Sequence, residues 1–292
     1  MSKEDLPLVS VCMITYAHED FIEKAIEGVV SQQASFRFEL VIGEDVGPDK
    51  TRDICIRYRE KYPDIIRLNL QPQNIGPQNN FMDTYNKCRG KYIALCEGDD
   101  FWIDPMKLQK QVDFMENNPG FSLCSHVSDV LEYGHMYNSA VPEKTELMIE
   151  DVISQNWAMM TASLFFRKAD LVFPDWFDKI KNGDYAMQLL ITLKGKAKIL
   201  PEAMSVYRKH AGGLSISLRA FSQAAWVIYL LYEFDGYTSG KYRSDILKKI
   251  KQIYKNQIGF AKEFGLRKEY ARLCVYRSLY YINPFMIKNA RK

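Results

Sequence analysis

The sequence lacks an apolar run long enough to span a bilayer. Its longest apolar stretch, AAWVIYLLY (224–232), falls well short of the roughly 18 residues that a transmembrane helix needs. The first ten residues, MSKEDLPLVS, are charged and have no apolar centre of the kind found in signal peptides. We therefore expect a cytoplasmic protein, with peripheral contact to the inner face of the cell membrane as a further option.

Several common site signatures are also missing. The 6 cysteines show no CxxC spacing and lie in apolar stretches, so we expect them to be reduced and structural. No GxGxxG motif follows the first apolar run, and GxxxxGK[ST] occurs nowhere. A dinucleotide fingerprint and a phosphate-binding P-loop are thus both excluded.

Charge is distributed unevenly along the chain. The net charge is only +3, but residues 219–292 contain 15 Lys plus Arg against 5 Asp plus Glu. The C-terminal part is therefore basic, and the preceding part is acidic. Such asymmetry is typical of an appendage that meets an anionic surface.

Hydrophobic periodicity predicts alternating strands and helices in the first hundred residues. Strands are expected at 8–15, 38–42, 65–70 and 91–96, and helices at 22–30, 50–61, 77–88 and from 105 onward. This alternation predicts an α/β fold whose mostly parallel, Rossmann-like sheet is flanked by helices. Farther along, the pattern predicts strands at 122–131 and 160–167, a helix at 183–193, a strand pair within 197–208 and three helical segments after 217.

The stretch YIALCEGDDFW (92–102) places three carboxylates directly after a buried strand. In a parallel sheet, ligands bind beyond the carboxyl ends of the strands. Carboxylate oxygens suit Mg²⁺ or Mn²⁺, and a bound cation would hold a diphosphate without a glycine-rich phosphate loop. A solvated turn at a helix start is the alternative reading of EGDD taken alone.

Four ordered motifs decide between these readings: VCMITYAHED, ELVIGEDVGPDKT, NIGPQNNF and GKYIALCEGDDFWIDPMKL. Together they resemble the family 2 glycosyltransferases, which have the GT-A fold, and the resemblance covers residues 7–216. It implies a GT-A domain at 1–216, with a nucleotide-sugar-binding half at 1–104 and an acceptor half at 105–216. Residues 217–292 would form a basic, aromatic-rich helical appendage.

The resemblance also implies the site. Asp99 and Asp100 would hold Mn²⁺ or Mg²⁺. The residues expected to bind the nucleotide sugar are Thr15, Tyr16, Glu19, Glu44, Asn74, Gly76, Asn80, Glu97, Gly98, Asp99, Arg208 and His210. Glu44 and Val46 stand where the family usually has aspartate and glycine, so the base preference stays open.

Asp184 is the expected general base, because the family's base lies at the start of a helix some distance after the metal-binding loop, which here is EGDD (97–100). Gly183 replaces the usual glutamate before it, and Asp175 and Asp178 are nearby alternatives. An inverting transfer needs such a carboxylate to take the proton from the attacking hydroxyl. The alternative for each of these residues is a purely structural role. An aspartate in the first turn of a helix, for example, stabilises the helix through the helix dipole.

The expected activity is transfer of one sugar from a nucleotide sugar, with UDP the favoured nucleotide, to a glycan or lipid-linked glycan in bacterial surface-polysaccharide synthesis. The QxxRW motif of processive members is absent. A sugar nucleotidyltransferase and a non-catalytic nucleotide-sugar-binding protein are the alternatives.

Basic and aromatic residues at 241–292 predict either contact with an anionic membrane or packing on the main domain. No nucleic-acid-binding module is recognised, and a homodimer stays open.

Overall fold

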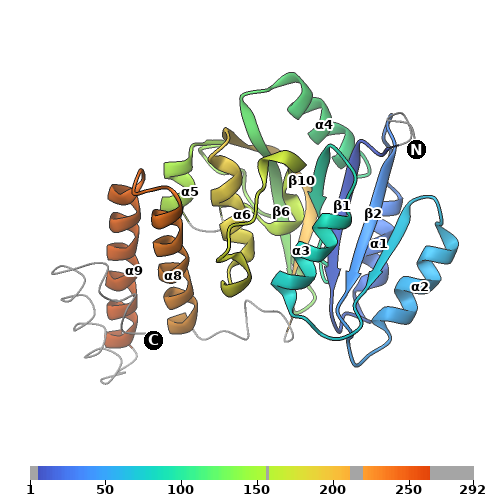
Figure 1. Cartoon of the computed structure of the whole chain (residues 1–292), viewed down its shortest axis with the longest axis horizontal. Helices are drawn as coiled ribbons and strands as arrows, with labels where there is room; N and C mark the ends of the chain where they lie inside the picture. Colours follow the sequence, from blue (N-terminus) through green and yellow to red (C-terminus); the bar gives the residue numbers. More distant parts are fainter. Residues whose placement is uncertain (1–5, 156–157, 211–219, 264–292) are drawn as a thin grey trace.

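The computed structural model describes residues 6–155, 158–210 and 220–263, and its centre is one sheet covered by helices on both faces (Figure 1). The strand order is β3-β2-β1-β4-β9-β6-β10-β5. The first four strands pair in parallel, which confirms the predicted parallel arrangement; they are β1 (Val9–Thr15), β2 (Phe38–Glu44), β3 (Ile66–Leu70) and β4 (Tyr92–Leu95).

Alternating side chains of these strands divide the core into two layers. Val9, Val11 and Met13 of β1 pack in the cluster that contains α1, α2 and α4, whereas Cys12 belongs to the cluster that contains α3. A strand buried on both faces is apolar almost throughout, which is why the sequence shows short continuous apolar runs. The helices are α1 (Ile22–Val30), α2 (Thr51–Lys61), α3 (Pro77–Lys87) and α4 (Lys107–Asn117).

The second half adds a second parallel pair, β6 and β10, joined to β4 through the antiparallel β9. Its strands are β5 (Phe101–Trp102), β6 (Phe121–Glu132), β7 (His135–Tyr137), β8 (Glu146–Leu147), β9 (Phe165–Arg167) and β10 (Lys196–Lys209). Its helices are α5 (Ile149–Gln155), α6 (Gly183–Thr192) and the 3₁₀ helices η2 (Thr161–Ser163), η3 (Lys168–Asp170) and η4 (Phe177–Lys179).

Two sequence-based expectations for this half were wrong. The predicted strand pair within 197–208 is one strand, β10, because the residues around Pro201 form an irregularity in its pairing with β6 and do not reverse the chain. The strand expected at 160–167 begins only at Phe165, because Thr161–Ser163 form the 3₁₀ turn η2.

Two long antiparallel helices, α8 (Ala220–Tyr237) and α9 (Arg243–Glu263), stand side by side at the end of the molecule opposite α2 (Figure 1). The ammonium group of Lys249 on α9 donates to the carbonyl of Ser154 on α5 at 2.5 Å, so the pair packs on the main domain. The predicted third helix lies outside the described residues. Within the described ranges no helix is long and apolar enough to cross a membrane. The five cysteines in these ranges are buried free thiols, as expected.

Candidate active site

The loops that follow β1, β2, β3 and β4 meet at one edge of the sheet, because these strands run parallel. The end of β10 reaches the same edge, since β10 runs parallel to β6, and β6 runs parallel to β4 through the antiparallel β9. Sequence-based reasoning placed the polar loops there, and the structure brings them together.

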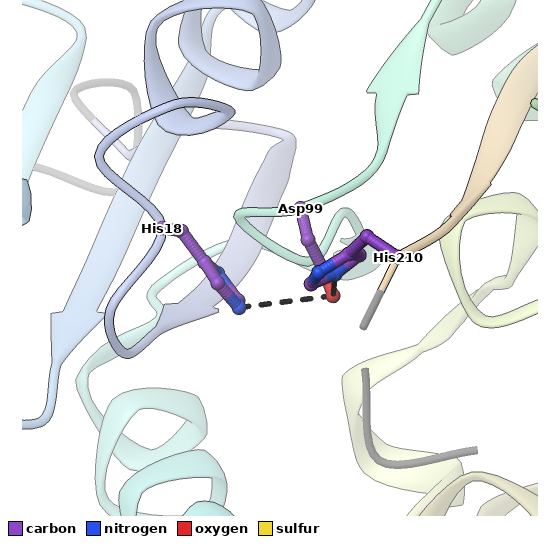
Figure 2. A group of neighbouring side chains, drawn as sticks. All are labelled: His18, Asp99 and His210. Atoms are coloured by element: carbon purple, nitrogen blue, oxygen red, sulfur yellow. Dashed lines mark hydrogen bonds and ion pairs between the residues drawn. The ribbon is translucent and has the colours of Figure 1, made fainter. Parts of the chain in front are cut away.

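At this edge His18, Asp99 and His210 form a compact group of possible metal ligands (Figure 2). The Nε2 atom of His210 lies 3.1 Å from Oδ2 of Asp99, and Nε2 of His18 lies 3.7 Å from the same oxygen. One ligand atom of each residue lies within 4.8 Å of the other two. The three side chains come from the loops after β1 and β4 and from the end of β10, so the fold, and not local sequence, assembles them.

His18 is held in place by its neighbours. Thr15 Oγ1 lies 3.2 Å from His18 Nδ1, so Nε2 is the ring nitrogen that faces Asp99. Gly98 allows the loop after β4 to approach this pair: a Cβ atom at Gly98 would lie 2.5 Å from Thr15 Oγ1 and 3.0 Å from His18 Nδ1. A glycine is therefore required between Glu97 and Asp99 for steric reasons.

The electrostatics of the group favour an ionised carboxylate between two imidazoles. Burial raises the pKa of Asp99, but the hydrogen bond with His210 and the charge of His18 outweigh burial and leave the pKa below its ordinary value. Burial lowers the pKa of His18, and the charge of Asp99 only partly opposes this. Metal binding requires a deprotonated carboxylate and a deprotonated imidazole, so the lowered pKa values of Asp99 and His18 both favour it.

Asp100 occupies a different position from Asp99. It is buried, and its Oδ1 accepts the amide hydrogen of Arg208 at 2.9 Å. Burial, together with the charges of Asp99 and Glu97, raises the pKa of Asp100 well above its ordinary value. Asp100 thus links the loop after β4 to β10, and it is not among the three clustered possible ligands.

Arg208 reinforces this link. Its Nη1 donates to the carbonyl of Asp99 at 2.8 Å, and its guanidinium lies 4.4 Å from the ring centre of Phe101 and 5.3 Å from that of Phe21. Phe21 also contacts the ring of His210, at 4.5 Å between ring centres. The side chain of Arg208 therefore fixes the loop that carries Asp99.

Glu97 and Asp184 bring the loop after β4 and the start of α6 together at the same edge. Burial raises the pKa of the Glu97 carboxyl, the charges of Asp99 and Asp184 raise it further, and a hydrogen bond from Thr161 of η2 opposes the rise. The carboxyl group of Glu97 is consequently close enough to Asp99 and Asp184 for their charges to affect its pKa. Asp184 stands in the first turn of α6, where its Oδ1 accepts its neighbour's amide hydrogen at 2.8 Å.

Glu44 at the end of β2 is completely buried, with both carboxylate oxygens engaged. Oε1 accepts the amide of Gly47 at 2.9 Å, and Oε2 pairs with Nε of Arg52, whose Nη2 donates to the carbonyl of Gln71. Tyr16, the residue after β1, is 46% exposed. Both oxygens of Glu44 are thus occupied by groups of the protein itself, whereas Tyr16 is exposed.

The loop after β3 is tied to β2. Asp45 accepts the amides of Ile75 and Gly76 at 2.8 and 2.9 Å, and Asn74 Oδ1 also accepts the amide of Gly76. Asn80 is buried and donates to the carbonyl of Gly43 at 2.9 Å. These contacts hold the loop after β3 against the end of β2.

Glu19 connects the loop after β1 to the start of α2. Its Oε2 accepts the amide of Lys50 at 2.9 Å, and its own amide donates to Asp49 Oδ2 at 2.9 Å. Every residue expected to bind the nucleotide sugar thus lies in the loops or strand ends of this edge, or in the adjoining first turns of α3.

Sequence-based reasoning missed three residues of the site. His18 lies in the motif VCMITYAHED but was not among the predicted ligands, and neither Asp45 nor Arg52 was predicted as a site residue. The only available signal for His18 was its place after a strand that ends at the ligand-binding edge. For Arg52, helix periodicity gave no indication that it would turn toward Glu44.

The sequence profile described as glycosyl transferase family 2 matches residues 10–173, and the chain belongs to that family. A protein of Mycobacterium tuberculosis strain H37Rv is 32% identical over 209 residues, which are 70% of this chain and 60% of that protein. The chain therefore spans less than two thirds of that relative. The Escherichia coli protein named UDP-Glc:alpha-D-GlcNAc-diphosphoundecaprenol beta-1,3-glucosyltransferase WfaP is 27% identical over 212 residues, covering 72% of this chain and 80% of WfaP.

Solved structures confirm the predicted GT-A fold. S. aureus TarS 1–349 in complex with UDP-GlcNAc superposes with a TM-score of 0.62 at 13% identity, covering 94% of this chain and 92% of that one. The mannosyltransferase PcManGT from Pyrobaculum calidifontis, in complex with GDP-Man and Mn²⁺, gives a TM-score of 0.59 at 14% identity and covers 98% of this chain and 84% of that one.

Proposed function

We propose that this chain is a metal-dependent, inverting glycosyltransferase that moves one sugar residue from a UDP-sugar to a hydroxyl group of a glycan or lipid-linked glycan. The observation that carries this proposal is the grouping of His18, Asp99 and His210 at the carboxyl edge of the sheet, with Asp184 within electrostatic reach of the same loop. The names of WfaP and of the TarS complex, which mention UDP-Glc and UDP-GlcNAc, support UDP as the nucleotide.

The donor atoms fit a divalent transition metal. His18, Asp99 and His210 offer two imidazole nitrogens and one carboxylate oxygen, which leave coordination positions for diphosphate oxygens. Mg²⁺ prefers oxygen ligands throughout, whereas nitrogen ligands suit transition metals, so Mn²⁺ fits this group better than Mg²⁺. When bound, the ion would neutralise the negative charge that develops on the departing UDP.

The chain's own residues do the rest. Asp184, at the start of α6, takes the proton from the acceptor hydroxyl as its oxygen attacks the anomeric carbon from the face opposite the diphosphate. Glu97 interacts with the charges of both Asp99 and Asp184 and accepts a hydrogen bond from Thr161, so it links the loop after β4 to the start of α6. Arg208 binds the carbonyl of Asp99 and thereby keeps the loop after β4 in place during transfer.

Release of UDP from UDP-sugars tests the proposal. The purified chain is incubated with UDP-Glc or UDP-GlcNAc, with GDP-Man as the comparison donor, in the presence of Mn²⁺ or EDTA. We expect Mn²⁺-dependent release of UDP from at least one UDP-sugar, and transfer with inversion at the anomeric carbon in NMR spectra of the product. Release that persists in EDTA would refute metal dependence, and retention of configuration would refute the inverting mechanism.

We also propose that α9 contacts an anionic membrane surface. Its exposed face carries Lys248, Lys251, Lys255 and Lys262, spaced so that they share one side of the helix, while Ile250 and Ile253 are buried on the other side. Each basic residue near an anionic surface contributes about 1 kcal/mol of binding free energy.

Reversing two of these charges, with Lys251→Glu and Lys255→Glu, is therefore expected to weaken binding to phosphatidylglycerol-containing vesicles by more than about tenfold. Co-sedimentation measures this, and the matched control is Lys61→Glu with Lys87→Glu, which reverses two exposed charges on α2 and α3. Equal binding of the wild type to phosphatidylcholine vesicles and to phosphatidylglycerol-containing vesicles would contradict the proposal.

A further inference from the structure

The hairpin formed by β6 and β7 carries the most exposed aromatic side chain of the described part of the chain. Tyr133 at its turn is 81% exposed, and Met136 and Tyr137 on β7 are 49% and 54% exposed. The packing of the fold leaves these side chains in solvent. Contiguous exposed apolar side chains mark binding surfaces more often than scattered ones do.

The hairpin lies at the same edge of the sheet as the candidate site. Arg208 and Lys209 at the end of β10 pair with Leu131 and Glu132 at the end of β6, and the next residue of the chain is His210. β10 pairs with one side of β6, and β7 and β9 both pair with its other side. β9 pairs with Leu123 and Cys124 near the start of β6, whereas β7 pairs with residues 130–132 at its end, so β7 lies nearer to the edge that carries the candidate site.

The turn residue itself points to a function outside folding. Tyr133 has φ +48° and Gly134 has φ +82°, the left-handed pair of a two-residue hairpin turn. Asn-Gly is the preferred sequence for such a turn, and a tyrosine in the first position has a strained backbone. Because the ring of Tyr133 is exposed, packing does not compensate for that strain.

The hairpin is held firmly enough to form a binding surface. Ser139, just after β7, donates its amide to Asp129 Oδ1 at 3.0 Å and its hydroxyl to the carbonyl of Ser128 at 2.6 Å. On the other side, Lys209 pairs with Glu132 at 3.2 Å. Both strands of the turn are thus anchored to neighbouring backbone or side chains.

Charge identifies the chemistry of the ligand. Residues 128–146 contain four carboxylates and one lysine, but Lys209 of β10 pairs with Glu132, and Lys196 and Lys198 of β10 pair with Glu146. The surface therefore carries no large excess of either charge, and it favours neither a strongly anionic nor a strongly cationic ligand. Tyrosine presents an apolar ring face together with a polar hydroxyl, which matches the apolar faces and hydroxyl groups of a sugar. An uncharged glycan is the ligand that meets both conditions.

We propose that Tyr133 and Tyr137 form a binding surface for an uncharged glycan acceptor, contacting sugar residues beyond the one that receives the donor sugar. This inference rests on the proposed glycosyltransferase function and specifies its acceptor class. The surface lies one strand away from His210, so the chain of the acceptor would leave the transfer site across the hairpin.

The test is retention of the full chain, with UDP and Mn²⁺, on an array of uncharged oligosaccharides of increasing length and of their phosphorylated counterparts. Tyr133→Asn places the preferred residue in the turn, so its melting temperature should stay equal to or exceed that of the wild type. Retention on the longer uncharged glycans should nevertheless fall roughly five- to tenfold. Val172→Ser, which shortens a side chain that is 60% exposed near η3, is the matched control and should be retained like the wild type.

The outcomes separate this inference from the proposed function. UDP release from UDP-sugars, measured on the same preparations, reports the proposed function alone. No retention of the wild type on any uncharged glycan, a preference for the phosphorylated glycans, or equal retention of Tyr133→Asn and wild type would each overturn the hairpin proposal. Loss of vesicle binding in Tyr133→Asn would overturn it in favour of a membrane contact.

Discussion

Asp99→Asn is expected to lower the turnover of UDP-sugar by roughly 10³-fold or more. The substitution preserves the shape of the side chain but removes the negative charge on which His18 and His210 converge. An amide oxygen is a weaker ligand for a divalent cation than a carboxylate, so Mn²⁺ affinity should fall together with turnover. Isothermal titration with Mn²⁺ and a UDP-release assay measure the two effects separately.

The matched control for this variant is Asp64→Asn, which removes an exposed carboxylate before β3, far from the described cluster. It should retain wild-type turnover and Mn²⁺ affinity. If Asp99→Asn bound Mn²⁺ as tightly as the wild type, the three-residue group would not be the metal site, however low its turnover.

Asp184→Asn is expected to lower transfer to an acceptor by about 10²- to 10⁴-fold, because a general base contributes that much to the rate. Binding of UDP should stay within about twofold of the wild type, since the donor contacts come from other loops; an asparagine is also well tolerated at a helix start. Rapid-quench kinetics of sugar transfer, paired with titration of UDP, separate the chemical step from donor binding.

Asp175 and Asp178 provide the comparison for this prediction. Both are exposed residues near η4, and their asparagine variants should transfer sugar at the wild-type rate. If Asp175→Asn or Asp178→Asn lost transfer while Asp184→Asn kept it, the base would be assigned to the wrong carboxylate.

Much of the fold followed from local patterns. The short apolar runs and the 3.6-residue spacing of apolar side chains correctly predicted β1–β4 and α1–α4, because in a parallel sheet each strand is buried on both faces and each helix on one. The acidic loop after β4 could also be placed, since the direction of a strand determines which end of the sheet its loop occupies. The strand pair predicted within 197–208 was wrong, because the irregularity around Pro201 interrupts the pairing of β10 with β6 without reversing the chain.

The contacts within the site could not be predicted in the same way. His210 meets Asp99 across 111 positions of the chain, and Arg208 meets Asp100 across 108. Local periodicity carries no information on pairs so far apart. The family motifs give the residue types, but they do not show which side-chain atoms already form hydrogen bonds within the protein. Asp99 and Asp100 look equivalent in sequence, but only Asp99 belongs to the cluster with two imidazoles.

Lys107 illustrates a further limit. It lies in the stretch PMKLQKQ and would be expected on the surface, yet it is completely buried. Its ammonium donates to Gln111 Oε1 at 2.7 Å and lies 3.9 Å from the ring centre of Trp102, and burial lowers its pKa to about 7. Tertiary packing of α4 against β5 decides this burial, and no feature of the local sequence indicates it.

The most direct test of the central claim is anomalous scattering from crystals of the full chain grown with UDP and Mn²⁺. The claim predicts a manganese peak bonded to the Asp99 carboxylate and to ring nitrogens of His18 and His210, with diphosphate oxygens completing the coordination. A manganese peak held by UDP alone or by other side chains, with His18 and His210 outside bonding distance, would contradict it.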